Sequence, residues 1–488
     1  MLFHSHAFLF LFLPVALLGF FTLGRWASPR AAGLWLTAAS LFFYGWWNPR
    51  YLPIIVGSVL VNYLCGAAIA GAVSKDDRPR ARRFLTAGIT ANLLLLAVYK
   101  YAGFVVANLG AIVGSHWTLS HIELPLAISF FTFTQIAYLT DAYHGRTREY
   151  DLGHYSLFVT FFPHLIAGPI VLYRSLMPQF ARPETYRFQG ANFAAGLTLL
   201  VCGLAKKVLV ADSISPIANG VFNSAASGAH PGALAAWTGA IAYSLQLYFD
   251  FSGYSDMAIG LARMFNTRFP LNFDSPYKAG DIIDFWRRWH ITLSTFLRDH
   301  LYIPLGGNRL GPVRRYVNLF ITMLLGGLWH GAGWTFILWG GLHGAYLCLN
   351  HGWLRVTAGQ GWAQSTAARF AGRGATLLAV IVGWVVFRAA NLTTAVGLLT
   401  SMAGRRGLGA RATATGQELA ILALAAAIAL LAPNSQELFR VALPAKETQD
   451  SAPAIWRWTA AQAALASVVF ALAVLHLSRI SDFLYFQF

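Results

Sequence analysis

The chain has 488 residues, of which 57% are hydrophobic and 11% are charged. Because soluble globular domains carry roughly 25% charged residues, this composition excludes an ordinary soluble protein and favours one that lies in a membrane. The chain has 36 Lys and Arg against 19 Asp and Glu, an excess that basic cytoplasmic loops explain better than nucleic-acid binding does. Its three cysteines are too few for a disulfide framework.

Apolar stretches of membrane-spanning length recur from one end of the chain to the other. Ala7–Leu23 is the first and Ile54–Val73 is another. A helical span needs about 20 mainly apolar residues, and on this criterion we predict about 11–13 spans. No basic segment precedes the first stretch and no clear cleavage site follows it, so we expect a retained helix rather than a signal peptide. The loop Lys75–Arg83 holds five basic residues, which predicts that it lies in the cytoplasm and the N-terminus outside.

The region 263–315 differs in composition from the rest, because it is amphipathic. We predict a single transmembrane domain with one shared buried core. It has three consecutive parts: an N-terminal helical block (1–262), this amphipathic centre (263–315) and a C-terminal helical block (316–488). In the centre, Asp281–Tyr302 has apolar residues at three- and four-residue steps, a period typical of a helix, and Asp284 and Arg288 are spaced for an ion pair. Because charges cross hydrocarbon at a high cost, we expect an interfacial or re-entrant helix here.

His290 lies on the apolar stripe of this expected helix. It follows Trp286 by four residues and precedes Leu293 by three. Side chains at these spacings share one face of a helix, so we expect His290 to point into the protein. A lone histidine in such a place is more often a hydrogen-bonded core residue than a catalytic group, and the pattern alone leaves both roles open.

His330 lies in Tyr316–Cys348, a stretch without acidic or basic side chains other than histidine. An ionisable residue at membrane depth is a functional-site hypothesis by default. Glycines at 326, 327, 331 and 333 flank it, and glycine lets a second helix or a ligand approach the backbone closely. An uncharged imidazole is the form that acts as a general base on a hydroxyl. A satisfied packing histidine is the alternative interpretation.

His343 is a weaker hypothesis. It follows His330 by 13 residues, which on a continuous helix is about 220° of rotation, so the two rings would face different ways unless the glycines break the helix. The segment Asp250–Asp256 offers carboxylates and hydroxyls but lacks the G-x-S-x-G pattern, and we expect helix termination or polar packing there. No phosphate loop, dinucleotide fingerprint or H-E-x-x-H pair occurs, so we expect no metal site.

Two strings closely resemble the membrane-bound O-acyltransferase family, in its bacterial branch that O-acetylates alginate. They are Phe285–Arg309 (FWRRWHITLSTFLRDHLYIPLGGNR) and Gly326–Gly344 (GGLWHGAGWTFILWGGLHG). Further segments are similar to that branch, namely Leu247–Ala262, Phe161–Ile170 and Phe483–Phe488, together with the string FLFLFLP (Phe8–Pro14) near the start and the turn YGWWNP (Tyr44–Pro49). The resemblance therefore extends over essentially the whole chain.

The resemblance implies an all-α polytopic fold around a central tunnel, with His330 as the catalytic histidine and His290 as the second active-site histidine. It implies no tightly bound cofactor and a cytoplasmic thioester donor, acetyl-CoA or an acylated carrier. It also implies a separate extracytoplasmic partner of the SGNH-hydrolase type that completes transfer to a polysaccharide. Lipids of the bacterial inner membrane would surround the protein, and no nucleic acid is expected as a partner.

We therefore expect a membrane-bound O-acetyltransferase that modifies an exopolysaccharide such as alginate. Peptidoglycan or cellulose would be modified by the same chemistry and remains open as the acceptor. A non-enzymatic transporter of glycan or lipid intermediates is the alternative from a different class. Transporters often show two halves with matching broken helices, whereas the motifs here fall in one half of the chain. A purely structural membrane subunit is a third class, and it predicts that both histidines tolerate substitution.

Overall fold

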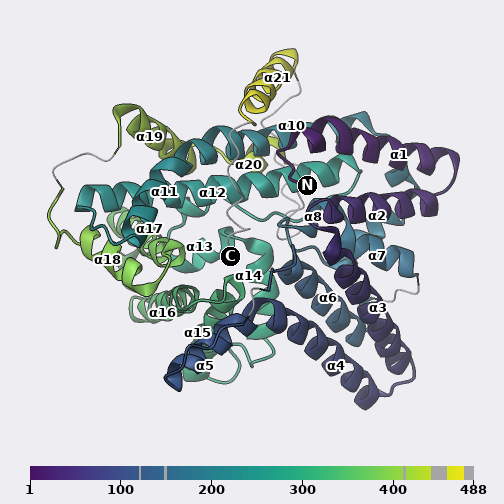
Figure 1. Cartoon of the computed structure of the whole chain (residues 1–488), viewed down its shortest axis with the longest axis horizontal. Helices are drawn as coiled ribbons and strands as arrows, with labels where there is room; N and C mark the ends of the chain where they lie inside the picture. The colour runs from purple at the N-terminus through teal and green to yellow at the C-terminus, as the bar shows by residue number, and fades with distance from the viewer. Residues whose placement is uncertain (120–121, 148–150, 410–413, 441–458, 478–488) are drawn as a thin grey trace. The chain divides into compact units, whose positions relative to one another are not determined.

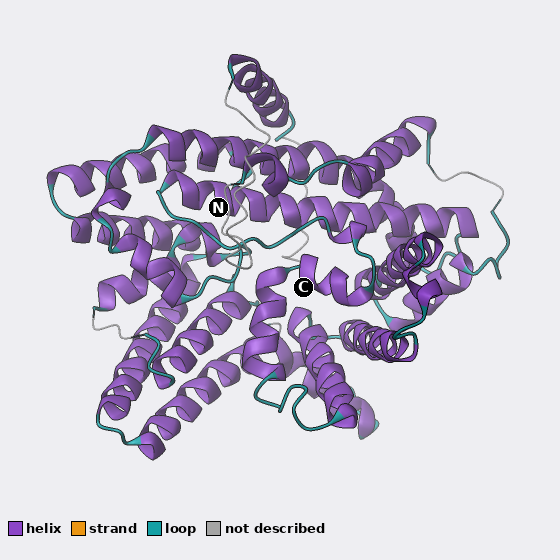
Figure 2. Cartoon of the chain, turned by 180° about the vertical axis from the view of Figure 1, so that it is seen from behind, coloured by secondary structure: helices purple, strands orange, loops and turns teal. Residues whose placement is uncertain are grey.

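The fold is all-helical, as a computed structural model of the chain shows. It describes residues 1–119, 122–147, 151–409, 414–440 and 459–477, so the motif Phe483–Phe488 lies outside the described residues. These residues form helices and no β-strand, which confirms the predicted class (Figures 1 and 2). Five helical segments are long and apolar enough to cross a membrane: Phe8–Trp26, Pro49–Ser74, Arg78–Ile112, Gly190–Ala226 and Thr366–Arg388. Three further apolar helices are shorter, and the expected 11–13 spans and central tunnel stay predictions.

The chain divides into two compact units that interleave along the sequence. The first contains Met1–Val201 and Tyr254–Pro270, and the second contains Cys202–Gly253, Leu271–Arg440 and the last described helix. Two long helices, α10 (Gly190–Ala205) and α12 (Ala233–Met264), contribute residues to both units. The predicted single domain with three consecutive parts stays a prediction.

The first unit is built mainly from the N-terminal helices. Its helices are α1 (Leu13–Trp26), α2 (Pro29–Gly45), α3 (Leu52–Ser74), α4 (Arg78–Leu96), α5 (Ala102–Ile112), α6 (Ile128–Tyr143), α7 (Leu152–Thr160), α8 (Phe162–Leu165) and α9 (Tyr173–Phe180). Helices α3 and α4 run side by side (Figure 1). Asn62 of α3 and Asn92 of α4 donate hydrogen bonds to each other at 3.2 and 2.6 Å, which ties the two apolar helices together.

The second unit contains the segments that carry the predicted site. Its helices are α11 (Asp212–Ala226), α13 (Ile282–Arg288), α14 (Ile291–Leu297), α15 (Pro312–His330), α16 (Trp334–Val356), α17 (Thr366–Arg388), α18 (Leu392–Met402), α19 (Gly416–Leu431), α20 (Ser435–Phe439) and α21 (Ala460–Leu475). Side-chain caps begin several of these helices; Thr415 and Glu418, for example, form a capping box at the start of α19.

Asp281–Tyr302 is not one helix, which corrects the expectation from its periodicity. The chain forms α13, breaks, and continues as α14, followed by a π-helical turn. His290, at the break, has φ 44° and ψ 53°, in the left-handed region. The reason is that backbone groups at the break bond to a distant segment: the N–H of Ile291 donates to Asn272 O at 2.9 Å, and Arg288 O accepts from the N–H of Asp274 at 2.9 Å.

The expected i,i+4 ion pair does form within α13. Arg288 Nε lies 2.8 Å from Asp284 Oδ1. Burial alone would lower the pKa of Arg288, but the hydrogen bond and charge of Asp284 raise it above its usual value. An interfacial or re-entrant position for this region stays a prediction.

Glycines bring α10 and α12 into close contact. A Cβ on Gly196 would overlap the backbone of Gly260 in the first unit, and a Cβ on Gly253 would lie 2.7 Å from Gly203 O in the second. Small residues at such contacts let two helix backbones approach each other in a membrane protein. The segment Asp250–Asp256 therefore lies inside a helix of 32 residues and packs there, rather than ending a helix.

Candidate active site

His290 is held in one orientation by an amide. Its ring is 1% exposed, and its Nδ1 lies 3.1 Å from Oδ1 of Asn272. The same Asn272 atom accepts from the backbone N–H of Thr292 at 3.3 Å and from its hydroxyl at 2.9 Å. A backbone N–H can only donate, so this Asn272 atom is the oxygen, and His290 must donate its Nδ1 proton to it. In the neutral ring, the lone pair is then on Nε2.

Aromatic rings enclose His290, which confirms that it points into the protein. The ring of Phe251 meets it edge-on at a centroid distance of 4.8 Å, and that of Trp329 lies at 6.4 Å. The left-handed backbone at His290 turns the chain sharply between α13 and α14. The histidine therefore projects from a bend rather than from a helix face.

His330 is the last residue of α15, where the chain reverses into α16. Gly331 leaves room for a ring at this reversal, because a Cβ on it would overlap the ring of Phe336, which would have to shift. A Cβ on Gly327 would likewise overlap Phe336 O and would lie 2.9 Å from Gly340 Cα. The glycines that flank His330 thus allow close approach of a second helix, as expected from the sequence.

The His330 ring is 8% exposed and lies among aromatic side chains. Ring centroids lie at 4.9 Å for Trp329, 5.1 Å for Trp339 and 5.3 Å for Phe387, each met edge-on. Trp329 also contacts His290, at 6.4 Å. The structure therefore brings the two predicted histidines, which are 40 residues apart in the sequence, onto one tryptophan.

His343 lies in the same aromatic cluster, which corrects the argument that it would face away from His330. The glycine-rich turn between α15 and α16 breaks the helix, so the rotation along a continuous helix does not apply. Trp339 contacts His343 at 4.8 Å and His330 at 5.1 Å. The His343 ring is fully buried, and its Nδ1 accepts a hydrogen bond from Trp286 Nε1 at 3.2 Å, so its proton is on Nε2.

Gly383 of α17 makes room for His343, and this contact gives a testable prediction. A Cβ on Gly383 would lie 2.8 Å from His343 Nε2. We expect Gly383→Ala to lower the free energy of unfolding by about 1–3 kcal/mol, because the hydrogen-bonded ring cannot shift cheaply. Chemical unfolding of the detergent-solubilised protein measures the change.

Gly374 on the same helix supplies the matched control. A Cβ there meets no atom within 4 Å. Gly374→Ala should therefore be neutral or stabilising, since alanine is the better helix former by about 1 kcal/mol. A Gly383→Ala protein as stable as the Gly374→Ala protein would contradict the close packing of His343.

Sequence reasoning missed a buried ion cluster in the second unit. Lys207, with a side chain 2% exposed, lies 2.8 Å from Asp212 Oδ1 and 2.7 Å from Asp250 Oδ1. The signal was present, because a lysine inside the apolar segment Gly190–Ala226 must have anionic partners. The spacing along the sequence did not indicate which carboxylates would pair with Lys207.

A fourth buried histidine was not singled out from the sequence. His164 of the first unit is 4% exposed, and its Nε2 donates to Phe158 O at 2.9 Å. Its sequence context, a histidine between apolar residues, was the available signal. Among the residues that the structure describes, no three His, Cys, Asp or Glu side chains lie together as a metal site would require.

The arrangement in the second unit is suited to proton transfer in an apolar environment. His290 presents a nitrogen lone pair whose position is set by Asn272. His330 and His290 both contact the ring of Trp329. Aromatic walls keep water away from a reacting ester, which would otherwise be hydrolysed. A hydroxyl that enters this cluster would find a base within a few ångströms.

Comparison with known proteins gives consistent results. The sequence model described as "MBOAT, membrane-bound O-acyltransferase family" matches residues 113–392, a segment of 280 of the 488 residues that includes all the histidines discussed above. The peptidoglycan O-acetyltransferase of Helicobacter pylori is 44% identical over 84% of this chain and 81% of its own. The probable alginate O-acetylase of Azotobacter vinelandii is 45% identical over 82% of this chain and 78% of its own. That of Pseudomonas putida is 41% identical over the whole of both chains.

Proposed function

Because the chain belongs to the membrane-bound O-acyltransferase family and is an O-acetyltransferase, we propose that it takes an acetyl group from a cytoplasmic thioester and passes it across the inner membrane of a bacterium for O-acetylation of a polysaccharide. One observation carries the proposal. His290 and His330, the two motif histidines, contact the same tryptophan inside a buried aromatic cluster. The donor is acetyl-CoA or an acylated carrier.

His330 acts as the general base. Its neutral imidazole takes the proton of the acceptor hydroxyl while the hydroxyl oxygen attacks the thioester carbonyl carbon. A C–O bond forms and the C–S bond breaks. The leaving thiolate then takes the proton from the imidazolium, which leaves an acetate ester, a free thiol and a neutral His330.

His290 orients a reactant rather than polarising the carbonyl. With its Nδ1 proton donated to Asn272, the neutral ring has only an acceptor on Nε2. An acceptor cannot stabilise the negative oxygen that develops on the thioester carbonyl. It can accept a hydrogen bond from an N–H or O–H of the donor or the acceptor molecule, and so hold that molecule for attack.

The acceptor class is a glycan, with alginate proposed first. The names of two relatives that align with the whole chain mention alginate, and that of another relative mentions peptidoglycan. Both polymers carry hydroxyls that the same chemistry would acetylate. We further propose that the ester formed at His330 is an intermediate, and that a separate extracytoplasmic protein of the SGNH-hydrolase type moves its acetyl group to a hydroxyl of the polymer, which frees the first hydroxyl again.

The test uses purified protein in vesicles with radiolabelled acetyl-CoA on one side. Acetylation of alginate oligomers, but not of peptidoglycan fragments, in the presence of the extracytoplasmic partner supports the proposal in full. Acetylation of peptidoglycan fragments alone would show that peptidoglycan, and not alginate, is the acceptor. Movement of glycan without any loss of the thioester would instead identify a transporter.

A further inference from the structure

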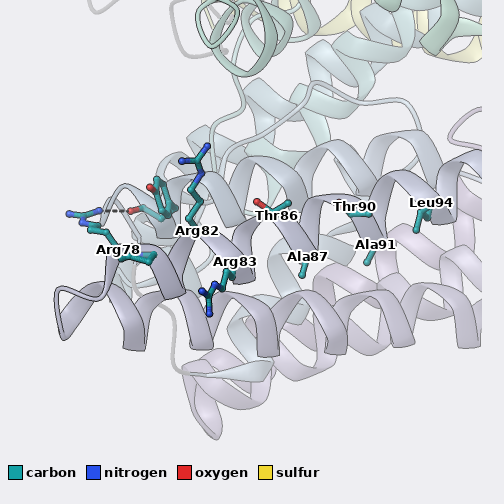
Figure 3. Close-up of a pocket in the computed structure, with 10 residues that line it drawn as sticks. Arg78, Arg82, Arg83, Thr86, Ala87, Thr90, Ala91 and Leu94 are labelled. Carbon is teal, nitrogen blue, oxygen red and sulfur yellow. Dashed lines mark hydrogen bonds between the residues drawn. The ribbon is translucent and has the colours of Figure 1, made fainter.

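A groove lies along α4 in the first unit (Figure 3). Its volume is about 940 Å³. All but one of the residues that line it come from a single stripe of α4: Arg78, Pro79, Arg82, Arg83, Thr86, Ala87, Thr90, Ala91 and Leu94, with Tyr143 of α6 at one end. The groove is therefore basic at the start of α4 and lined by small or apolar side chains beyond it.

Two of the three arginines at the basic end are not neutralised by a carboxylate. Within the described ranges, neither Arg82 nor Arg83 forms an ion pair. Arg78 donates to Tyr143 O at 3.1 Å, the bond drawn in Figure 3, and lies 3.9 Å from the exposed Asp76. Guanidinium groups match the geometry of phosphate oxygens, so this end is complementary to a phosphate.

Beyond the arginines, the groove is lined mainly by small side chains and ends at Leu94. Thr86, Ala87, Thr90 and Ala91 follow one another along the helix, and their small side chains leave the groove open as far as Leu94 (Figure 3). From Arg82 to Leu94 the helix rises about 18 Å. One leaflet contributes roughly 15 Å of hydrocarbon. A groove of this length would reach from headgroup level to near the middle of a bilayer.

The environment of α4 also points to lipid. It lies in Arg78–Ile112, a helical segment long and apolar enough to cross a membrane, and only 11% of the apolar window of this segment is buried by protein. We propose that the groove binds one anionic glycerophospholipid from the leaflet next to the basic loop. Its phosphate contacts Arg82 and Arg83, and one acyl chain lies along the small residues up to Leu94. A soluble anion would use the basic end alone and would leave the apolar stripe empty.

The headgroup is tested by binding of phosphatidylglycerol to delipidated protein, measured by native mass spectrometry, with phosphatidylcholine as the zwitterionic comparison. A direct hydrogen bond from a guanidinium to a phosphate contributes about 1 kcal/mol or more, which is roughly fivefold in affinity, so Arg82→Gln should weaken phosphatidylglycerol binding about fivefold and the double change with Arg83→Gln about 25-fold. Phosphatidylcholine, whose choline cation offsets the charge of its phosphate, should bind more weakly and should lose less affinity in both variants.

Arg80 provides the matched control. It is exposed on the same turn of α4 but does not line the groove, and its guanidinium lies 5.8 Å from the centre of the Phe84 ring. Arg80→Gln removes the same charge and should leave the affinity within twofold. An equal loss in both variants would mean that diffuse charge, and not this groove, attracts lipid, and would overturn the proposal.

The acyl chain is tested by filling the groove. Ala91→Phe should weaken phosphatidylglycerol binding several-fold, whereas Leu93→Phe, at an exposed position outside the groove, should not. Unchanged lipid binding in Ala91→Phe would overturn the proposal, as would full displacement of the lipid by millimolar inorganic phosphate. Because these side chains are exposed, neither variant disturbs the core, and a native elution volume verifies this.

Discussion

Replacing His330 by alanine is expected to abolish acetyl transfer, with a loss of at least about 10²–10⁴-fold in turnover. The change removes the only imidazole at the end of α15 and leaves the glycine contacts of that helix in place. The base for the acceptor hydroxyl is then missing, while the helices can still pack. Turnover is measured with radiolabelled acetyl-CoA, and O-acetyl content is measured on glycan from cells that carry only the variant.

A histidine elsewhere on the same helix pair provides the control. His351 of α16 is half-buried and lies 2.8 Å from Arg315. His351→Ala should keep turnover within a few-fold of the unmodified protein. Wild-type O-acetylation by folded His330→Ala protein would remove the catalytic role, whereas a protein that is absent from the membrane would call for His330→Gln, which retains most of the volume but cannot act as a base.

Among these variants, Lys207→Met is expected to lower the free energy of unfolding most. Lys207 is the cation between two buried carboxylates, those of Asp212 and Asp250. Removing one partner of a buried ion pair leaves an uncompensated charge and costs about 3–5 kcal/mol. We therefore expect a much smaller folded fraction in detergent, measured by thermal unfolding and by yield from the membrane.

Two further variants separate charge from packing. Lys206→Met changes the neighbouring lysine, which is half-buried and bonds to Ser435 Oγ at 3.2 Å, and it should cost far less. The triple variant Lys207→Met with Asp212→Asn and Asp250→Asn removes all three charges and should recover much of the lost stability. If Lys207→Met were as stable as Lys206→Met, the ion cluster would contribute little.

Local pattern was sufficient for several features. The low charge content and recurrent apolar stretches predict a helical membrane protein, because hydrocarbon leaves the backbone no partner but its own helix. The spacing of Asp284 and Arg288 predicts their ion pair, since residues four apart on a helix are neighbours. The glycines around His330 predict close helix contact, because only a missing Cβ permits it.

Long-range contacts decided the rest. The helix predicted over Asp281–Tyr302 breaks at His290, because backbone bonds to Asn272 and Asp274 replace the helical ones, and periodicity says nothing about such partners. The histidines at 330 and 343 share Trp339 only because a turn of glycines folds α16 back on α15.

The charges show the same division. The sequence shows that Lys207 must be compensated in an apolar segment. Only the packing of α12 beside it brings Asp250, 43 residues away, within 2.7 Å. Residue type and spacing thus determined which groups are costly to bury in this protein, whereas the tertiary structure decided their partners, because a partner's distance in space is not encoded by its distance along the chain.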